Sequence, residues 1–329
     1  MLNSFAKSHI GQRKNNEDTI LVDKEAGLYV VADGVGGLNK GDVASQMACD
    51  IVNDSIVAGE TLKESIYIAH RSIVNQIKSN QQNQGMATTI AAVLFHDNSY
   101  EVAWVGDSRV YLWDEKLQLI TRDDSYVELL LENGHITVDE LETHPDRNII
   151  SQALGIERKE IRIHSNFGKL EKNQTLLICS DGLYTIAKES DIIKCFQNND
   201  DVENITESLV NTAVENDGKD NISLISINAQ NFHSQDSEIQ EPIVFREYDN
   251  NTGNYVLNVF AGKNKQQEQE SDPELIDQTT FKDLSQDDRN KLDSAADEQV
   301  PEKKEFNYSV PIVLVSIIIF VGLFLLNNN

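Results

Sequence analysis

Cysteine is scarce in this chain of 329 residues. Its three cysteines, Cys49, Cys179 and Cys195, are too few and too widely spaced for a disulfide framework or a zinc site. The N-terminal 18 residues also lack the apolar run of a signal peptide. Both absences indicate a protein of a reducing compartment.

Basic residues are also in short supply, with 28 against 54 acidic residues and a formal net charge of -26. A charge of this sign repels nucleic-acid phosphates, so we expect no nucleic-acid partner. An acidic chain instead suits the binding of divalent cations, solubility through charge, or a disordered acidic segment.

One long run without charge lies at the C-terminal end. Val310–Leu326 holds 17 uncharged residues, almost all of them Val, Ile, Leu or Phe. As a helix this run would be roughly 26 Å long, slightly under a hydrocarbon core of about 30 Å. A buried core helix is the alternative, although such a uniformly apolar one after a polar stretch would be unusual. The sequence therefore predicts a single transmembrane helix at 309–327.

The charges around this run predict its orientation. Lys303 and Lys304 precede it, and only three asparagines follow it. Positively charged flanks tend to stay in the cytoplasm, although Glu302 and Glu305 weaken the bias. We therefore expect a single-pass membrane protein whose preceding domain is cytoplasmic.

Residues 1–228 have the pattern of one compact domain. Runs rich in Val, Ile and Leu that end at Gly, Asp or Asn predict strands at 27–32, 88–95, 100–105, 109–113, 117–121, 160–167, 175–179 and 222–227. Apolar residues at helical spacing predict helices at 42–58, 61–79, 188–196 and 202–215. Hairpin-length turns join several strand pairs, so the predicted class is α+β, with mainly antiparallel sheets covered by helices.

The composition changes after this domain. Residues 230–308 contain 18 acidic and 8 basic residues, with frequent Gln, Asn and Ser. This pattern predicts a flexible, self-repelling linker over 229–308. One strand–turn–strand pattern at 243–260 interrupts it and predicts a hairpin, which would need a surface to add to.

Four short acidic motifs stand at the ends of predicted strands. They are Arg13-Lys-Asn-Asn-Glu17-Asp18, Asp33-Gly-Val-Gly-Gly37, Ser180-Asp-Gly182 and Gly218-Lys-Asp-Asn221. Each motif alone is an ordinary turn, and most such turns are structural. Together they predict more, because a carboxylate at the end of a buried strand is costly unless it binds something. Converging oxygen ligands suit Mg²⁺ or Mn²⁺, and Arg13 offers a planar cation for a phosphate.

These motifs, with Gly106-Asp-Ser-Arg109 and in this order, resemble the metal-dependent protein phosphatases (protein phosphatase type 2C), over about residues 5–228. The resemblance implies an α/β/β/α sandwich of two antiparallel sheets flanked by helices. It implies a serine/threonine protein phosphatase that uses two Mn²⁺ or Mg²⁺ ions, or three. Its partners would be phosphorylated proteins and a serine/threonine kinase that it opposes at the membrane.

The resemblance also implies roles for individual residues. Asp33 bridges two ions, the Gly34 carbonyl contacts one of them, and Asp181 and Asp220 bind the first. Arg13 holds the substrate phosphate.

For five further residues the resemblance implies a less direct role or leaves two interpretations open. Glu17 and Asp18 act mostly through metal-bound waters, and Asn221 supports the ligands. Asp107 binds a third ion, as in bacterial members, or is a simple turn residue. His144 lies in a region that resembles the mobile flap of those members, where it either touches substrate or is loop structure.

One position departs from many eukaryotic members. Where these carry a histidine thought to protonate the leaving alcohol, this chain has Val35. The general acid is therefore left open between a metal-bound water and a flap residue. The competing interpretation of the whole chain is a catalytically inactive, membrane-tethered binding module with the same fold. Loss of a metal aspartate would favour it, and none is lost.

Overall fold

The computed structural model describes residues 2–35, 40–141, 143–156, 161–199, 201–229, 243–249 and 254–257. The predicted membrane helix at 309–327 and most of the predicted linker lie outside these residues. Among the described residues, no helix is long and apolar enough to cross a membrane.

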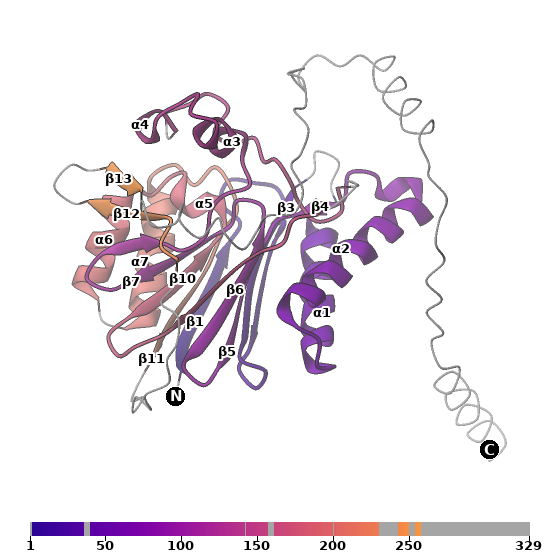
Figure 1. The fold of residues 1–329 in the computed structure, drawn as a ribbon, viewed down its shortest axis with the longest axis horizontal. Coiled ribbons are helices and arrows are strands. Elements are labelled where there is room, and N and C mark those ends of the chain that lie inside the picture. Colours follow the sequence, from indigo (N-terminus) through magenta and orange to yellow (C-terminus); the bar gives the residue numbers. More distant parts are fainter. Residues whose placement is uncertain are drawn as a thin grey trace. The chain divides into compact units, whose positions relative to one another are not determined.

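The described strands form two antiparallel sheets (Figure 1). The first contains, in spatial order, β1 (Leu2–His9), β11 (Ile222–Ala229), β10 (Thr175–Cys179), β7 (Arg109–Trp113), β8 (Leu117–Leu119), β12 (Arg246–Asp249) and β13 (Asn254–Leu257). The second contains β2 (Asp18–Asp23), β3 (Leu28–Val35), β5 (Ile90–His96), β6 (Ser99–Val105) and β9 (His164–Lys169), with β4 (Ala87–Thr88) paired to β3. The antiparallel pairing confirms the predicted fold class.

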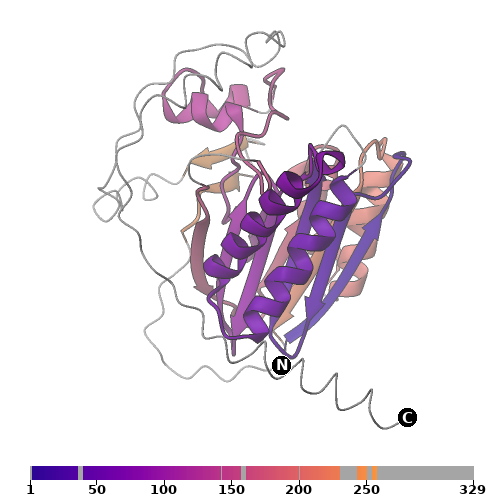
Figure 2. The same ribbon diagram turned by 90° about the vertical axis from the view of Figure 1, so that its right-hand side faces the viewer.

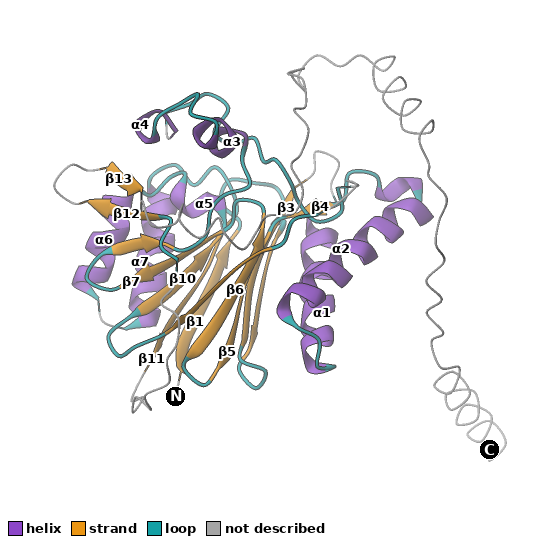
Figure 3. Cartoon of the chain, viewed as in Figure 1, coloured by secondary structure: helices purple, strands orange, loops and turns teal. Residues whose placement is uncertain are grey.

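Helices cover the outer faces of both sheets (Figures 1 and 2). Those on the second sheet are α1 (Gly41–Val57) and α2 (Leu62–Ser79), and those on the first are α6 (Glu189–Asn198) and α7 (Val202–Glu215). Shorter elements connect the layers: the 3₁₀ turn η1 (Gln81–Asn83), α3 (Tyr126–Glu132), α4 (Val138–Leu141) and α5 (Asp181–Tyr184). The order helix, sheet, sheet, helix is the sandwich that the sequence resemblance implied (Figure 3).

Side-chain alternation along the strands builds three cores. On β3, Leu28, Val30 and Ala32 pack under α1 and α2, whereas Tyr29 and Val31 pack between the two sheets. The third core, under α6 and α7, takes the other faces of strands such as β10 and β11. Because the side-chain period of a strand is 2, the residue that follows Val31 on the inter-sheet face is Asp33. The strand pattern therefore aims this carboxylate into the layer between the sheets.

The predicted hairpin at 243–260 exists as β12 and β13. β12 extends the first sheet by pairing with β8, Arg246 opposite Leu119 and Glu247 opposite Gln118. The Arg246 side chain is buried and forms an ion pair with Glu128 of α3, whose exposed fraction is 5%. An isolated hairpin needs a surface to add to, and this one adds to the edge of the first sheet at β8.

Several elements were not predicted from the sequence. The strand β1 and the short helices α3, α4 and α5 carried no recognisable pattern. The predicted strand at 160–167 was placed too early, because β9 begins at His164. The predicted strand at 88–95 is divided into β4 and β5.

Replacing Arg246 tests how firmly the hairpin is held. We expect Arg246→Met to lower the free energy of unfolding by about 3 kcal/mol, because it leaves the buried Glu128 carboxylate without its cation. The double variant Arg246→Met/Glu128→Leu should recover most of the loss. Lys116→Met is the matched control: its pair with Glu247 is exposed and should contribute less than about 1 kcal/mol. Urea unfolding measures all three, and equal losses for Arg246→Met and Lys116→Met would contradict the expectation.

Candidate metal centre

The centre of the site is a pair of aspartates on neighbouring strands. Asp18 begins β2 and lies directly opposite Asp33 of β3 in the antiparallel register. Both follow the alternation that places Ile20, Val22, Tyr29 and Val31 between the sheets. Two like-charged groups are thereby brought together at one end of the inter-sheet layer.

Two serines support Asp18: Ser180, which lies between β10 and α5, and Ser223 of β11. The Ser180 hydroxyl donates to Asp18 Oδ2 over 2.8 Å and accepts from the Ser223 N–H over 3.0 Å. The other carboxylate oxygen of Asp18, Oδ1, is buried and has no hydrogen-bond partner among the described residues. Because a buried acceptor without a partner is costly, this oxygen indicates that a ligand belongs here.

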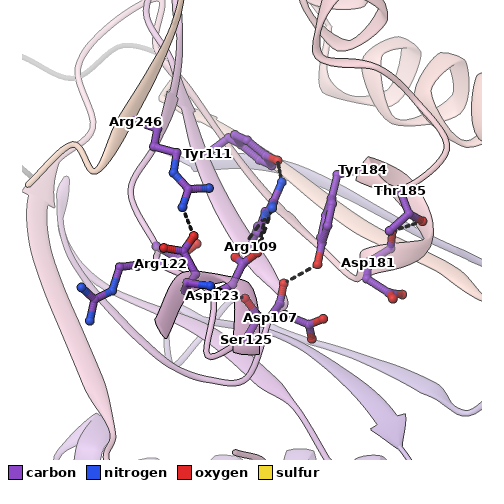
Figure 4. A network of polar contacts seen from close by, with 12 residues as sticks. Asp107, Arg109, Tyr111, Arg122, Asp123, Ser125, Asp181, Tyr184, Thr185 and Arg246 are labelled. Carbon is purple, nitrogen blue, oxygen red and sulfur yellow. Dashed lines mark hydrogen bonds and ion pairs between the residues drawn. The ribbon is translucent and has the colours of Figure 1, made fainter. Parts of the chain in front are cut away.

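Asp107, Asp181 and Asp220 complete the acidic cluster. Asp107 lies in the turn between β6 and β7, and Asp181 is the first residue of α5. Figure 4 shows how α5 holds both: the Tyr184 hydroxyl donates to the Asp107 carbonyl over 2.9 Å, and the Thr185 hydroxyl donates to the Asp181 carbonyl over 2.7 Å. Asp220 precedes β11.

The carboxylates raise one another's pKa. Burial, and then the charges of Asp18, Asp181, Asp107 and Asp220, raise the pKa of Asp33 well above its ordinary value. Burial is also the largest cause at Asp18, whose pKa is raised to about 6, and at Asp181, whose pKa is raised to about 7. The cluster is therefore short of positive charge, which is the condition that a divalent cation relieves.

Arg13 supplies one cation at the edge of the cluster. Its guanidinium forms an ion pair with Asp220, and this hydrogen bond, with the charges of Asp220, Asp181 and Asp33, raises the pKa of Arg13. The side chain remains 54% exposed. The structure thus places Arg13 beside three of the predicted metal ligands, where the predicted contact with a phosphate can be made.

Glu17 and Gly34 meet the N-terminus of α1. Lys40, the residue before this helix, gives it no side-chain cap, and the Ser45 hydroxyl of α1 donates to the Glu17 carbonyl over 2.6 Å. A Cβ on Gly34 would lie 2.4 Å from the Gly41 carbonyl carbon, so the backbones touch here and only glycine fits. Glu17 therefore holds the first turn of α1 against the strand that carries Asp33.

Asn221 holds the N-terminal loop in place. Its amide accepts from the Glu17 N–H over 2.8 Å and donates to the carbonyls of Ile10 and Asn15 over 2.9 and 3.0 Å. The backbone of Asn221 also packs so closely on Gly182 that a Cβ there would lie 1.9 Å from its carbonyl oxygen. Asn221 thus joins three of the four sequence motifs.

A buried arginine network behind the cluster was not predicted. Arg109, 7% exposed, donates to both carboxylate oxygens of Asp123, with a shortest distance of 2.8 Å. It also donates to the Tyr111 hydroxyl over 2.9 Å and stacks on the Tyr184 ring 3.7 Å from its centroid (Figure 4). One signal pointed to Asp123: like Asp33 and Asp181, it closely follows an apolar strand.

His144 lies in the segment after α4. It makes an edge contact with the Tyr126 ring at 6.4 Å, and its Nδ1 accepts the Asp146 N–H over 3.1 Å. The contacts found for it among the described residues are with this segment, with Tyr126 of α3 and with Leu141 of α4. Its predicted contact with substrate stays a prediction.

The residues fit a divalent cation site by their chemistry. Among the described residues, no three histidine, cysteine, aspartate or glutamate side chains already stand in a geometry that holds a metal ion. The side chains would therefore have to turn toward a bound ion. The buried, unpartnered Asp18 oxygen and the mutual repulsion of the cluster both favour such binding, and carboxylate and carbonyl oxygens are what Mg²⁺ and Mn²⁺ prefer.

Comparison with known proteins agrees with this geometry. The family model for protein phosphatase 2C matches residues 6–224. The serine/threonine phosphatase stp of Listeria monocytogenes is 31% identical over 229 residues, which cover 65% of this chain and 90% of that protein. The protein phosphatase PhpP of Streptococcus pneumoniae is 33% identical over 241 residues, 67% of this chain and 96% of that protein. The chain therefore belongs to the protein phosphatase 2C family.

Solved structures show the same fold. The serine/threonine phosphatase PstP/Ppp of Mycobacterium tuberculosis matches with a TM-score of 0.65 at 30% identity, over 70% of this chain and 99% of that chain. A structure of the catalytic domain of PstP in complex with two manganese ions matches with a TM-score of 0.61 at 29% identity, over 69% of this chain and 97% of that chain.

The raised pKa values predict how stability changes with pH when no metal is added. A carboxyl whose pKa is higher in the folded state than in the unfolded state binds its proton more tightly when folded. Its stabilisation is fully present below its unfolded pKa of about 4, and is lost as the pH rises through about 7. We expect the chain in EDTA to lose on the order of 2 kcal/mol between pH 5 and 8.

Urea unfolding of the full-length chain at several pH values measures this loss. Asp181→Asn should flatten the profile, because the amide does not titrate. Added Mn²⁺ should restore stability at pH 8, since metal binds the deprotonated folded form. A wild-type profile that rises from pH 5 to 8, or one that Asp181→Asn leaves unchanged, would show that the cluster does not govern stability.

Proposed function

We propose that this chain is a metal-dependent phosphatase that hydrolyses phosphoserine and phosphothreonine in proteins. The observation that carries the proposal is the acidic cluster: aspartates from five separate parts of the chain lie close enough together at one end of the inter-sheet layer that four of them raise the pKa of the fifth, Asp33. Membership of the protein phosphatase 2C family and relatives named serine/threonine phosphatases support it.

We assign a role to each residue of the cluster. Asp18, Asp33, Asp181 and Asp220, together with the Gly34 carbonyl, would hold two Mn²⁺ or Mg²⁺ ions, and Asp107 a third. When bound, these ions supply charge neutralisation and the activation of a water for attack on phosphorus.

Arg13 is the residue that binds the phosphate. Its exposed guanidinium offers planar, paired donors for two phosphoryl oxygens, and its position beside Asp220 and Asp181 keeps a phosphate next to the metal ligands. A cysteine mechanism finds no support in the structure. Cys179 is fully buried, and burial raises the pKa of its thiol.

Loss of metal or of a cluster aspartate should abolish turnover. We expect hydrolysis of a phosphothreonine peptide by the full-length chain to require Mn²⁺ or Mg²⁺ and to stop with a chelator. Asp33→Asn and Asp181→Asn should each lower kcat by about a hundredfold or more, because metal-dependent stabilisation of the transition state is lost. Arg13→Ala should instead act largely by raising KM.

Steady-state kinetics with circular dichroism as a folding control decides among the outcomes. Activity that survives exhaustive metal removal would contradict the mechanism. A chain that binds Mn²⁺ but hydrolyses no phosphopeptide would be the inactive binding module instead.

We also propose that the apolar segment at 309–327 anchors the enzyme in a membrane, with the phosphatase domain in the cytoplasm. The support comes from the sequence: 17 uncharged residues at 310–326, with Lys303 and Lys304 before them. A phosphatase held there would act on phosphoproteins near the membrane and oppose a serine/threonine kinase.

Fractionation with protease treatment tests the anchor. The full-length chain should sediment with membranes and stay protected from protease added outside intact cells or spheroplasts. A variant truncated after Asn307 should be released and remain active. Sedimentation of the truncated chain with membranes, or cleavage of its phosphatase domain from outside, would contradict the proposal.

A further inference from the structure

A cleft lies beside the metal centre. Its volume is about 290 Å³, and Tyr184 and Thr185 form one of its walls. The same two residues hold the cluster, through the hydrogen bonds from Tyr184 to the Asp107 carbonyl and from Thr185 to the Asp181 carbonyl (Figure 4). The cleft and the metal centre are thus two sides of the turn at α5.

Cations outnumber carboxylates around this cleft. Four basic side chains line it, against two acidic ones: Arg109, Arg147, Lys188 and Arg246 against Asp123 and Glu189. The chain as a whole carries a net charge of -26, so the lining of this cleft has the opposite sign to the chain's overall charge.

Two of these cations form ion pairs with carboxylates of the protein, and the other two can contact a ligand. Arg109 is paired with Asp123, and Arg246 with Glu128. Arg147 and Lys188 are exposed and, among the described residues, form no ion pair with a carboxylate. They stand on different walls, Arg147 in the segment after α4 and Lys188 just before α6, so an anion between them could be held from both sides.

The third wall comes from outside the family domain. Arg246 belongs to β12, which lies beyond the residues 6–224 that the family model matches. Its ion pair with Glu128 ties β12 to α3, and Val127 of α3 also lines the cleft. The hairpin that follows the domain therefore helps to shape this cleft.

We propose that this cleft is a substrate subsite that binds an anionic side chain of the phosphoprotein, either a carboxylate or a second phosphoryl group, close to the residue that is dephosphorylated. The inference rests on the proposed phosphatase activity. Arg147 and Lys188 contact the anion, and Tyr184 and Thr185 set its distance from the metal centre. The enzyme therefore prefers phosphoproteins with acidic or multiply phosphorylated segments.

Peptide kinetics on the full-length chain with Mn²⁺ tests this subsite. One phosphothreonine peptide is made in a neutral form and in forms that carry a single aspartate or phosphoserine at successive flanking positions. At the best position we expect kcat/KM to rise about three- to tenfold over the neutral peptide, mainly through KM. The aspartate and phosphoserine series distinguish the carboxylate from the second phosphate.

The ratio of anionic to neutral peptide within each variant then locates the effect, because it cancels any general loss of activity. Lys188→Gln and Arg147→Gln should each lower this ratio, and the double variant should bring it close to 1. Lys24→Gln is the matched control: it removes an exposed lysine in the turn between β2 and β3 and should leave the ratio unchanged.

The outcomes separate the subsite from the activity on which it rests. No Mn²⁺-dependent hydrolysis of any peptide would overturn both the proposed function and the subsite. Hydrolysis without a preference for anionic peptides would overturn the subsite alone. A preference that persists in the double variant, or that falls equally in Lys24→Gln, would do the same.

Discussion

The site depends on one constraint: two aspartates that repel each other are held face to face by the register of β2 and β3. Asp18 and Asp33 cannot separate without breaking a strand pair whose other inward residues are buried between the sheets. A register slip of one residue would turn those apolar side chains toward the helices, so the core fixes the carboxylates. The cost of their proximity is offset only in part, by the Ser180 hydroxyl at Asp18 and by Arg13 at the edge of the cluster. The remaining repulsion is the energy that a divalent cation releases on binding.

A single buried guanidinium, that of Arg109, positions the residues behind the aspartate cluster. Arg109 donates hydrogen bonds to Asp123 and lies over the ring of Tyr184, whose hydroxyl in turn donates to the Asp107 carbonyl. Since Tyr184 belongs to the helix that Asp181 begins, two of the aspartates are positioned through one cation. A lysine could not replace it, because the stacking and the paired hydrogen bonds both need the planar fork of an arginine.

Sequence patterns predicted the parts of the fold that have a clear period, and the aspartates at their ends. The helices near 42–58 and 61–79 repeat apolar residues over many turns, and the strands that precede Asp33 and Asp181 are continuously apolar. β1 was missed because Asn3, Ser4 and Lys7 interrupt its apolar pattern, so its strand identity comes from pairing with β11. α5 is too short to show a period. The pairing of Arg13 with Asp220 and the anchoring of the loop by Asn221 depend on that unpredicted β1–β11 contact, and nothing local in the sequence could indicate them.

The pairing of β1 with β11 also decides when the site can form during synthesis. Leu2 lies opposite Ala229 and His9 opposite Ile222. The first strand of the domain therefore cannot pair until β11, where the region matched by the family model ends, has been synthesised. Closing a contact of such long sequence separation is slow, because the entropy of the intervening chain must be lost before the strands gain from pairing. Arg13 and Glu17 follow β1 directly, and Asp220 and Asn221 precede β11. A ribosome-bound fragment that ends before Asp220 therefore holds Arg13 and Glu17 without their partners, and the nascent protein acquires its metal ligands as a complete set only after nearly the whole domain has emerged.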